Sequence, residues 1–142
     1  MKQDNILLID KPAGWTSFDV VAKLRGQIRA SYKARGVTPT KRQLKVGHAG
    51  TLDPFATGLL VILLGDATKR AGEFLKLDKT YEATITLGAT STTGDPEGDI
   101  HPFQGQTLEN KEKEDSLSNN FQGPTLESVE RVLSQLVGEI TQ

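Results

Sequence analysis

The 142-residue sequence contains no cysteine, so disulfides, thiolate metal sites and thiol nucleophiles are all excluded. Long hydrophobic runs are also missing. The longest aliphatic run, residues 59–64, is about a third of the length that a membrane-spanning helix requires. Residues 6–9 are too few to form the apolar core of a signal peptide. We therefore expect a cytoplasmic protein without a membrane segment.

The composition, 36% hydrophobic and 25% charged residues, is that of one globular domain. Strand-like and helix-like segments follow one another without regular alternation and without internal repeats. This order predicts an α+β fold.

Three apolar segments dominate the first half of the chain. Residues 6–9 form a short run before a turn rich in Pro and Gly, which predicts a buried strand. Thr16 or Ser17 can then cap a helix, because apolar residues recur at helical spacing over residues 18–28. The continuous run at residues 59–64 predicts a strand covered on both faces, with a buried helical turn as the alternative.

Three further elements are predicted in the second half. Residues 66–76 are expected to form a short helix. Residues 81–87 alternate between apolar and polar side chains, as a half-exposed strand does. Residues 126–137 carry an apolar stripe between Thr125, a cap, and Gly138, a stop, which predicts a core-facing helix.

Charge is distributed unevenly, although the net charge is only −1. Residues 23–45 carry a charge of +8 with no acidic residue, which leaves −9 for the rest of the chain. The basic residues are Lys23, Arg25, Arg29, Lys33, Arg35, Lys41, Arg42 and Lys45. Such a cluster attracts polyphosphate, but a solvated basic helix followed by a loop gives the same pattern. Residues 31–45 lack a sustained period and predict a basic mobile loop.

Residues 94–120 are acidic, polar and poor in apolar side chains, which predicts an exposed connection. Within this stretch, Asp95, Glu97 and Asp99 alternate in the manner of a calcium loop. The later glutamate of that loop pattern is absent, so we interpret these residues as an exposed acidic turn and predict no metal site.

Asp53 lies between Leu52 and Pro54 in a segment rich in glycine, directly before an apolar run. Pro54 restricts the backbone of Asp53, and the nearby glycines let a ligand approach closely. A carboxylate held in this way is suited to act as a nucleophile or as a general base. Aspartate before proline is also a common helix N-cap without chemistry, and the local sequence alone favours the cap.

Residues 47–60 read G-H-A-G-T-L-D-P-F-A-T-G-L-L and resemble the catalytic motif of the TruB family of tRNA pseudouridine synthases over their whole length. Three further segments resemble the family in order and spacing: Asp10-Lys11-Pro12 with Gly14, Thr16 and Ser17, then Gly65-Asp66-Ala67-Thr68-Lys69, then Lys79-Thr80-Tyr81-Glu82-Ala83. The resemblance implies a pseudouridine-synthase-like catalytic domain with a mixed, largely antiparallel sheet and flanking helices. Residues 1–142 would be the N-terminal portion of that domain, which is incomplete in this chain.

The resemblance further implies an enzyme that isomerises uridine to pseudouridine in the T arm of tRNA (position 55). Asp53 corresponds to the catalytic aspartate, Tyr81 to the tyrosine that stacks on the base, and His48 to a histidine that meets RNA beside the extruded nucleotide. The other substrate-binding positions are Gly50, Thr51 and Leu52. Stacking on an aromatic ring contributes about 1–3 kcal/mol per base, which can replace the stacking that a flipped uridine loses. Without the resemblance, Tyr81 is an inward-facing strand aromatic and His48 an ordinary structural or exposed histidine.

The reaction exchanges a C–N for a C–C glycosidic bond without net oxidation, so we expect no cofactor and no metal. The carboxylate could add to C6 of the base, attack C1′ of the sugar or remove a sugar proton, and the residues do not distinguish these routes. The expected contacts to RNA phosphates are Lys23, Arg25, Lys41, Arg42, Lys45, Lys69 and Arg70. A solvated helix face is the alternative for Lys69 and Arg70. Lys11 with Pro12 corresponds to a family element that shapes the pocket floor, a structural role.

Several family features do not occur in this sequence. They are a Pro-Pro pair with a Tyr-Ser-Ala-x-Lys string, an arginine that pairs with the catalytic aspartate, a hydrophobic residue that closes the pocket and an RNA-binding domain. Ser91 also stands where the family often has aspartate. Without the arginine, the titration and orientation of Asp53 would shift, so the alternative function is an RNA-binding half-domain that is inactive alone.

We expect tRNA as the partner and a monomer for the full-length protein. A remote third class, an aspartate-nucleophile phosphatase, lacks the second aspartate two residues after Asp53.

Overall fold

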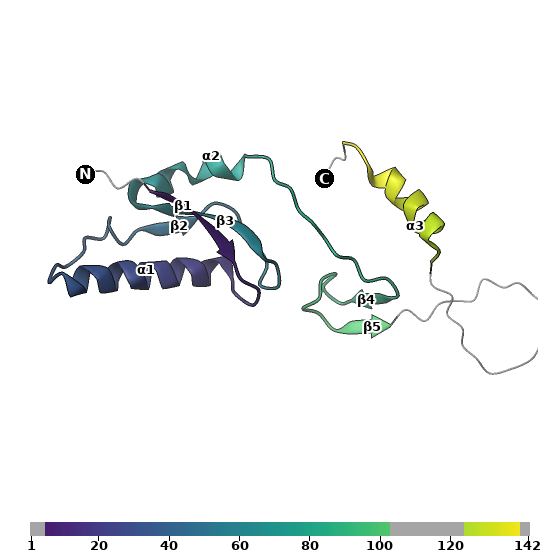
Figure 1. Cartoon of the computed structure of the whole chain (residues 1–142), viewed down its shortest axis with the longest axis horizontal. Coiled ribbons are helices and arrows are strands. Elements are labelled where there is room, and N and C mark those ends of the chain that lie inside the picture. Colours follow the sequence, from purple (N-terminus) through teal and green to yellow (C-terminus); the bar gives the residue numbers. More distant parts are fainter. Residues whose placement is uncertain (1–4, 103–123, 140–142) are drawn as a thin grey trace, which may run out of the picture. The chain divides into compact units, whose positions relative to one another are not determined.

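The computed structural model describes residues 5–102 and 124–139, which belong to two compact units, residues 1–82 and 83–142. The first unit contains β1 (Ile6–Lys11), α1 (Ser17–Ala34), β2 (Val46–His48), β3 (Gly58–Leu64), the 3-10 helix η1 (Gly65–Arg70) and α2 (Ala71–Leu75) (Figure 1). The second contains β4 (Ala89–Ser91), β5 (Ile100–Pro102), α3 (Leu126–Leu133) and the 3-10 helix η2 (Ser134–Leu136). Helices combined with antiparallel strands confirm the predicted α+β class. Within residues 5–102 and 124–139, no helix has the length and apolar character needed to cross a membrane.

The sheet of the first unit is antiparallel, with β3 in the centre and the order β1-β3-β2. Lys11 pairs with Gly58 and Ile6 with Leu63, so the end of β1 meets the start of β3. This register places the turn after β1 beside the segment that enters β3. The strand predicted at residues 59–64 is confirmed, and the alternative of a helical turn is wrong.

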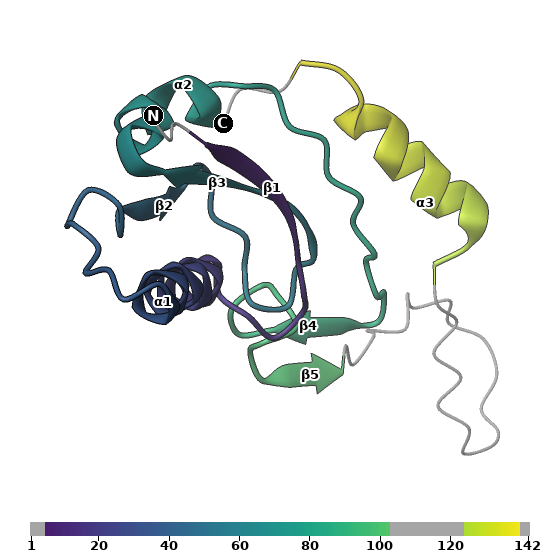
Figure 2. The ribbon, with the colours of Figure 1, turned by 60° about the vertical axis from the view of Figure 1, so that its left-hand side comes forward.

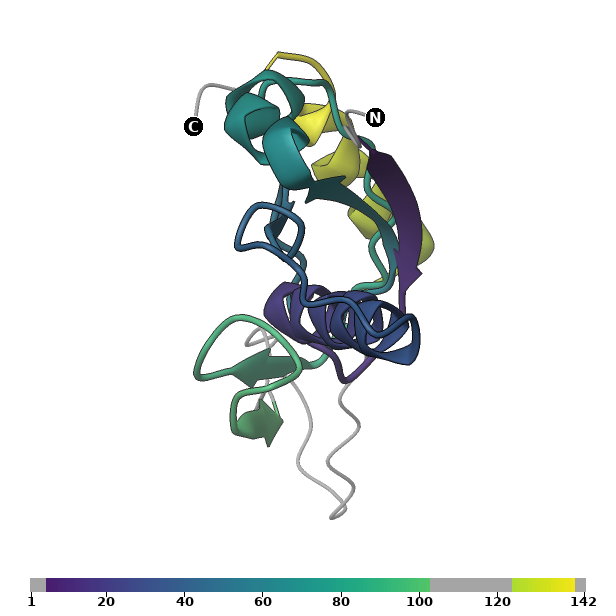
Figure 3. The same ribbon diagram turned by 90° about the vertical axis from the view of Figure 1, so that its left-hand side faces the viewer.

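Helices cover the two faces of this sheet, as Figures 2 and 3 show. Val20 and Val21 of α1 pack with residues of β2 and β3 on one face, and Leu60 and Ile62 of β3 are fully buried there. On the other face, Leu63 packs with Ala67 of η1 and with side chains of α2.

Two predictions are correct only in part. Residues 6–9 were expected to form a buried strand, and β3 was expected to be covered on both faces. Leu8 of β1 and Leu59 of β3 are exposed by 67% and 65%. The second helical layer packs around Leu63, near the far end of β3, and a residue near the start of that strand gains no cover from it.

The start of α1 agrees with the sequence prediction, and its end does not. Thr16 caps the helix in a reciprocal capping box with Asp19, and the Thr16 hydroxyl lowers the pKa of the Asp19 carboxyl below its usual value. The helix continues to Ala34, so the first four residues of the loop predicted at residues 31–45 are helical. The first residue that breaks the helix is Gly36, at φ +70°.

The strand predicted at residues 81–87 is wrong. Residues 81–86 have no regular structure, and Ile85 is 74% exposed. Alternating side chains fit a strand, but a strand forms only where a neighbour completes the hydrogen-bond ladder, and no described strand pairs with these residues. The strand nearest to them in sequence is β4, which pairs with β5.

The stretch predicted as an exposed connection, residues 94–120, is described only as far as residue 102, and the remainder lies outside the described residues. Its first part joins β4 to β5. Asp95 accepts hydrogen bonds from the Thr93 hydroxyl at 2.7 Å and from the Glu97 amide at 2.9 Å, and the Thr93 bond lowers the pKa of this carboxyl. These contacts form a local turn.

The helix predicted at residues 126–137 begins after its Thr125 cap, which accepts from the Ser128 amide, and ends as η2. The prediction that it faces a core is wrong for the described part of the chain. Leu126, Leu136 and Val137 are exposed by 73%, 59% and 82%, because no core cluster of described residues includes this helix.

Candidate catalytic site

Asp53 lies in the connection between β2 and β3, and its side chain is exposed. The Ala56 amide donates to the Asp53 carbonyl at 3.1 Å, so the chain makes a turn here, and no helix follows. The interpretation of Asp53 as a helix cap is therefore wrong. Within residues 5–102 and 124–139, no hydrogen bond or ion pair engages the Asp53 carboxylate, which leaves this carboxylate free for a ligand.

The backbone just after Asp53 is held by the turn that follows β1. The Lys11 ammonium is fully buried and donates to three carbonyl oxygens, those of Pro12 at 3.0 Å, Trp15 at 2.6 Å and Pro54 at 3.2 Å. The Gly14 amide also donates to the Pro54 carbonyl, at 2.7 Å, from a backbone at φ +76° that favours glycine. A buried charge needs such partners to offset its desolvation, so Lys11 and the Pro54 carbonyl stabilise each other.

The backbone just before Asp53 is held by the start of α1. The Ser17 hydroxyl accepts from the Leu52 amide at 2.9 Å and donates to the Leu52 carbonyl at 3.3 Å. Ser17 is only 2% exposed. Asp53 thus lies between two residues whose backbone groups are fixed by partners far away in sequence.

His48 is the last residue of β2 and is half-buried. Its Nδ1 lies 2.6 Å from the Gly50 carbonyl oxygen. Because a carbonyl can only accept, Nδ1 carries a proton in this contact, and in the neutral form of the ring Nε2 is the acceptor. Gly50 has φ +115°, a conformation that favours glycine and sets its carbonyl beside the ring.

The structure places the substrate-binding residues predicted before Asp53 in one continuous segment with it. Thr51 is exposed, and Leu52 is half-buried against the core beneath α1. Tyr81 differs from these residues. It is 69% exposed, lies in no strand, and no described contact joins it to Asp53 or His48.

Two basic residues predicted to contact phosphates have structural partners near α1. The Lys23 ammonium lies 4.9 Å from the centre of the Trp15 ring, and an Arg25 guanidinium nitrogen donates to the Val46 carbonyl at 3.2 Å. Arg25 therefore ties α1 to β2.

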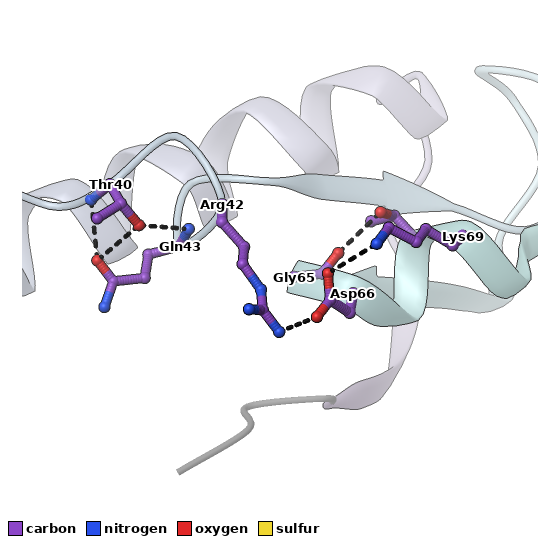
Figure 4. Close-up of polar contacts among 7 residues, drawn as sticks. Thr40, Arg42, Gln43, Gly65, Asp66 and Lys69 are labelled. Atoms are coloured by element: carbon purple, nitrogen blue, oxygen red, sulfur yellow. Dashed lines mark hydrogen bonds and ion pairs between the residues drawn. The ribbon is translucent and has the colours of Figure 1, made fainter.

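Three more of these basic residues form ion pairs around η1. Arg42 and Lys69 both pair with Asp66, Lys69 at 3.4 Å (Figure 4). Arg70 pairs with Glu73 at 2.8 Å and lowers the pKa of that carboxyl. The side chains of Lys41 and Lys45 are exposed and have no ion pair or hydrogen bond in the described part of the chain.

An open cavity of about 950 Å³ lies among the second half of α1, the loop at residues 35–45 and the end of β3. Its lining includes Arg35, Arg42 and Leu64, and no residue of the segment 47–60. Leu64 is six residues beyond Gly58 along β3, roughly 20 Å in a strand. The cavity is therefore separate from Asp53.

The sequence did not reveal the contacts of Ser17 and Lys11. Ser17 is recognisable as a potential cap, but the cap is Thr16, and the Ser17 hydroxyl instead turns inward to a residue 35 positions away. For Lys11, the available signal is a lysine that directly extends an apolar strand, where an ammonium needs carbonyl partners.

The family model described as TruB family pseudouridylate synthase (N terminal domain) matches residues 35–142. The chain belongs to this family. It is 51% identical over 103 residues to tRNA pseudouridine synthase B of Chlorobaculum tepidum, an alignment that covers 72% of this chain and 39% of that protein. It is 40% identical over 141 residues to tRNA pseudouridine synthase B of Bacteroides fragilis, with 99% and 51% covered. The match to tRNA pseudouridine synthase B of Thermobifida fusca is 48% over 97 residues, with 68% and 29% covered. The chain thus spans about half, or less, of the length of these relatives.

Proposed function

We propose that the natural protein containing these residues is a tRNA pseudouridine synthase, an isomerase that converts uridine to pseudouridine in the T arm. The names of the relatives support the reaction and the substrate. One structural observation supports Asp53 as the catalytic residue. Its carboxylate is exposed and unpartnered among the described residues, while the backbone on both sides is fixed through Leu52 and Pro54. A reactive group on a rigid support is pre-positioned for its substrate.

In this proposal the uridine leaves its stacked position in the RNA and enters the site beside Asp53. Nε2 of His48 is oriented as an acceptor by the bond from Nδ1 to Gly50, and it would meet the RNA beside the flipped nucleotide. Gly50, Thr51 and Leu52 would line the approach to Asp53. Tyr81 would stack on the base, which requires that its exposed side chain lie beside Asp53 when RNA binds.

For the RNA phosphates, the contacts divide into two groups. Lys41 and Lys45 would bind phosphate without giving up an intramolecular partner among the described residues. The other five (Lys23, Arg25, Arg42, Lys69 and Arg70) would have to share or exchange the partners described above. Exposed ion pairs cost little to exchange, about 0–1 kcal/mol each. We therefore expect Lys41 and Lys45 to contribute more to the free energy of tRNA binding than the other five basic residues.

We further propose that the reaction proceeds without cofactor or metal, that the natural protein is a cytoplasmic monomer, and that residues 1–142 are the N-terminal portion of its catalytic domain. A second function has support from one observation. The described residues bring no cation to Asp53, so we expect residues 1–142 alone to bind tRNA without turning it over.

Tritium release from a tRNA transcript labelled at C5 of uridine tests these proposals. The natural protein should release one tritium per T arm, and replacing the T-arm uridine with cytidine should abolish the release. Release that persists after this replacement would contradict the proposed target. Residues 1–142 alone should retain tRNA in a filter-binding assay but release no tritium, and turnover by this fragment would rule out the half-domain interpretation.

A further inference from the structure

Ser17 stands out among the buried polar side chains because both of its hydrogen bonds go to one residue of a distant segment. Its hydroxyl accepts from the Leu52 amide at 2.9 Å and donates to the Leu52 carbonyl at 3.3 Å, across 35 positions of sequence. Leu52 immediately precedes Asp53. Two bonds to one peptide residue fix both its position and its orientation, whereas a single bond would still allow rotation.

The opposite side of Asp53 is fixed by different groups. The Pro54 carbonyl accepts from the Lys11 ammonium and from the Gly14 amide. With the Ser17 hydroxyl removed, the hydrogen bonds on the Leu52 side would be lost. The packing of the Leu52 side chain against the core would remain, but it does not fix the orientation of the peptide groups, so the backbone of Asp53 could pivot about Pro54. The Ala56 amide bond to the Asp53 carbonyl lies on the Pro54 side and would not prevent this movement.

We propose that Ser17 is a positioning residue for Asp53, acting through the backbone of Leu52. The inference rests on the proposed function, because it assigns Asp53 the reaction. Ser17 itself touches no reacting atom in this proposal. It fixes the position and orientation in which the carboxylate meets the flipped uridine. A displacement of about 1 Å in such a group can slow a reaction about a hundredfold.

The site of Ser17 also explains why a hydroxyl is required there. Ser17 is the first residue of α1 and is 2% exposed, so water does not readily replace its bonds. An alanine would fit the same space and the same helix, but it would leave the Leu52 amide and carbonyl without partners. Ser17→Ala is therefore a variant that should fold while losing the attachment.

The test uses the natural protein under single-turnover conditions, with enzyme in excess over tritium-labelled tRNA. We expect Ser17→Ala to lower the rate constant about tenfold to a hundredfold, with the full amplitude and with tRNA affinity within about twofold of the wild type. Ser17→Thr, which keeps the hydroxyl, should restore the rate constant to within about threefold of the wild type. A purely structural role would instead lower the fraction of folded enzyme and would leave the rate constant at saturating enzyme unchanged.

Thr68→Val is the matched control. The Thr68 hydroxyl donates to the Gly65 carbonyl at 2.8 Å at the other end of β3, so this variant also removes a bond between a side chain and the backbone. It should leave the rate constant unchanged. A wild-type rate constant in Ser17→Ala, or equal losses in Ser17→Ala and Thr68→Val, would overturn the positioning role.

Asp53→Asn, measured in parallel, separates this inference from the proposed function. An inactive Asp53→Asn together with a fully active Ser17→Ala would contradict only the role of Ser17. A fully active Asp53→Asn would contradict the proposed function, and the positioning role would be rejected with it. Amide hydrogen exchange at Leu52, expected to accelerate in Ser17→Ala, checks the attachment directly, and unchanged exchange would also count against the role.

Discussion

Asp53 and Asp66 lie beyond opposite ends of β3, and their surroundings differ. Asp66 follows the strand and pairs with both Arg42 and Lys69, which ties the basic loop to η1. Asp53 precedes the strand, and its carboxylate has no partner among the described residues, although the backbone around it is held by Ser17, Lys11 and Gly14. The Asp66 carboxylate thus holds the loop at residues 35–45 against η1. Around Asp53 the backbone is held by other residues, and the Asp53 carboxylate remains available to substrate.

The largest expected effect comes from changing Asp53 itself. We expect Asp53→Asn to lower kcat in the natural protein by about 10²–10⁴-fold or more, the range over which a positioned acid or base contributes. Its unfolding free energy should stay within about 0.5 kcal/mol of the wild type, because the carboxylate has no partner among the described residues. Asp66→Asn should keep kcat within about threefold. Equal losses of kcat in the two variants would remove the distinction between these aspartates.

Lys11→Met should produce the largest loss of stability. The variant removes a buried ammonium from three part-buried carbonyls, of which, among the described residues, only that of Pro54 keeps a second donor, the Gly14 amide, and we expect the unfolding free energy to fall by about 2–3 kcal/mol in urea titrations. Lys79→Met is the matched control, since the Lys79 ammonium also donates to two carbonyls, those of Leu75 and Leu77, but is exposed. A similar change in both variants would show that burial of Lys11 adds nothing.

Lys41→Ala should weaken tRNA binding with little effect on kcat. Removing one phosphate contact should reduce the slope of log affinity against log salt concentration by about 0.7–0.9. The control is Lys76→Ala, an exposed lysine outside the basic segment, which should leave the slope unchanged. An unchanged slope in Lys41→Ala, measured by filter binding over a salt series, would exclude Lys41 as a phosphate contact.

The smallest effect is expected from the ion pairs of Asp66. The Arg42 side chain is 59% exposed, so solvent screens the pair, and Asp66→Asn should lower the unfolding free energy by less than about 1 kcal/mol. Amide exchange in residues 35–45 should nevertheless accelerate, because this loop loses its side-chain attachment to η1. Unchanged exchange there would mean that backbone contacts, such as the Gly65 amide to the Lys45 carbonyl at 2.8 Å, hold the loop alone.

Features of the fold that depend on neighbouring residues were predictable from the sequence. The start of α1 at a Thr16 or Ser17 cap and the apolar run of β3 carry their signals within a few residues. The end of α1 was predicted too early. Residues 31–34 contain no helix breaker, but their side chains are compatible with both helix and loop, so the sequence does not mark where the helix ends. The strand expected at residues 81–87 was wrong because alternation reports on side chains and says nothing about a pairing partner.

In the candidate site, too, local features were predictable and contacts between distant residues were not. The motif around Asp53 was recognised, since its residues are contiguous in sequence. The attachment of Leu52 to Ser17 and of Pro54 to Lys11 spans 35 and 43 positions, and no local pattern encodes it. Similarly, the positive charge of the basic segment was readable, but its ion pairs with Asp66 were not, because they depend on how the loop meets η1.

The role of the Asp53 carboxylate is tested most directly by a single-turnover comparison of wild type and Asp53→Asn on one tritium-labelled tRNA, with binding and release followed in the same samples. If the Asp53 carboxylate performs the chemistry and does not stabilise the fold, the variant should bind tRNA with an affinity within about threefold of the wild type. It should then release no tritium within many wild-type half-lives. Release at the wild-type rate by the bound variant would exclude Asp53 as the catalytic residue.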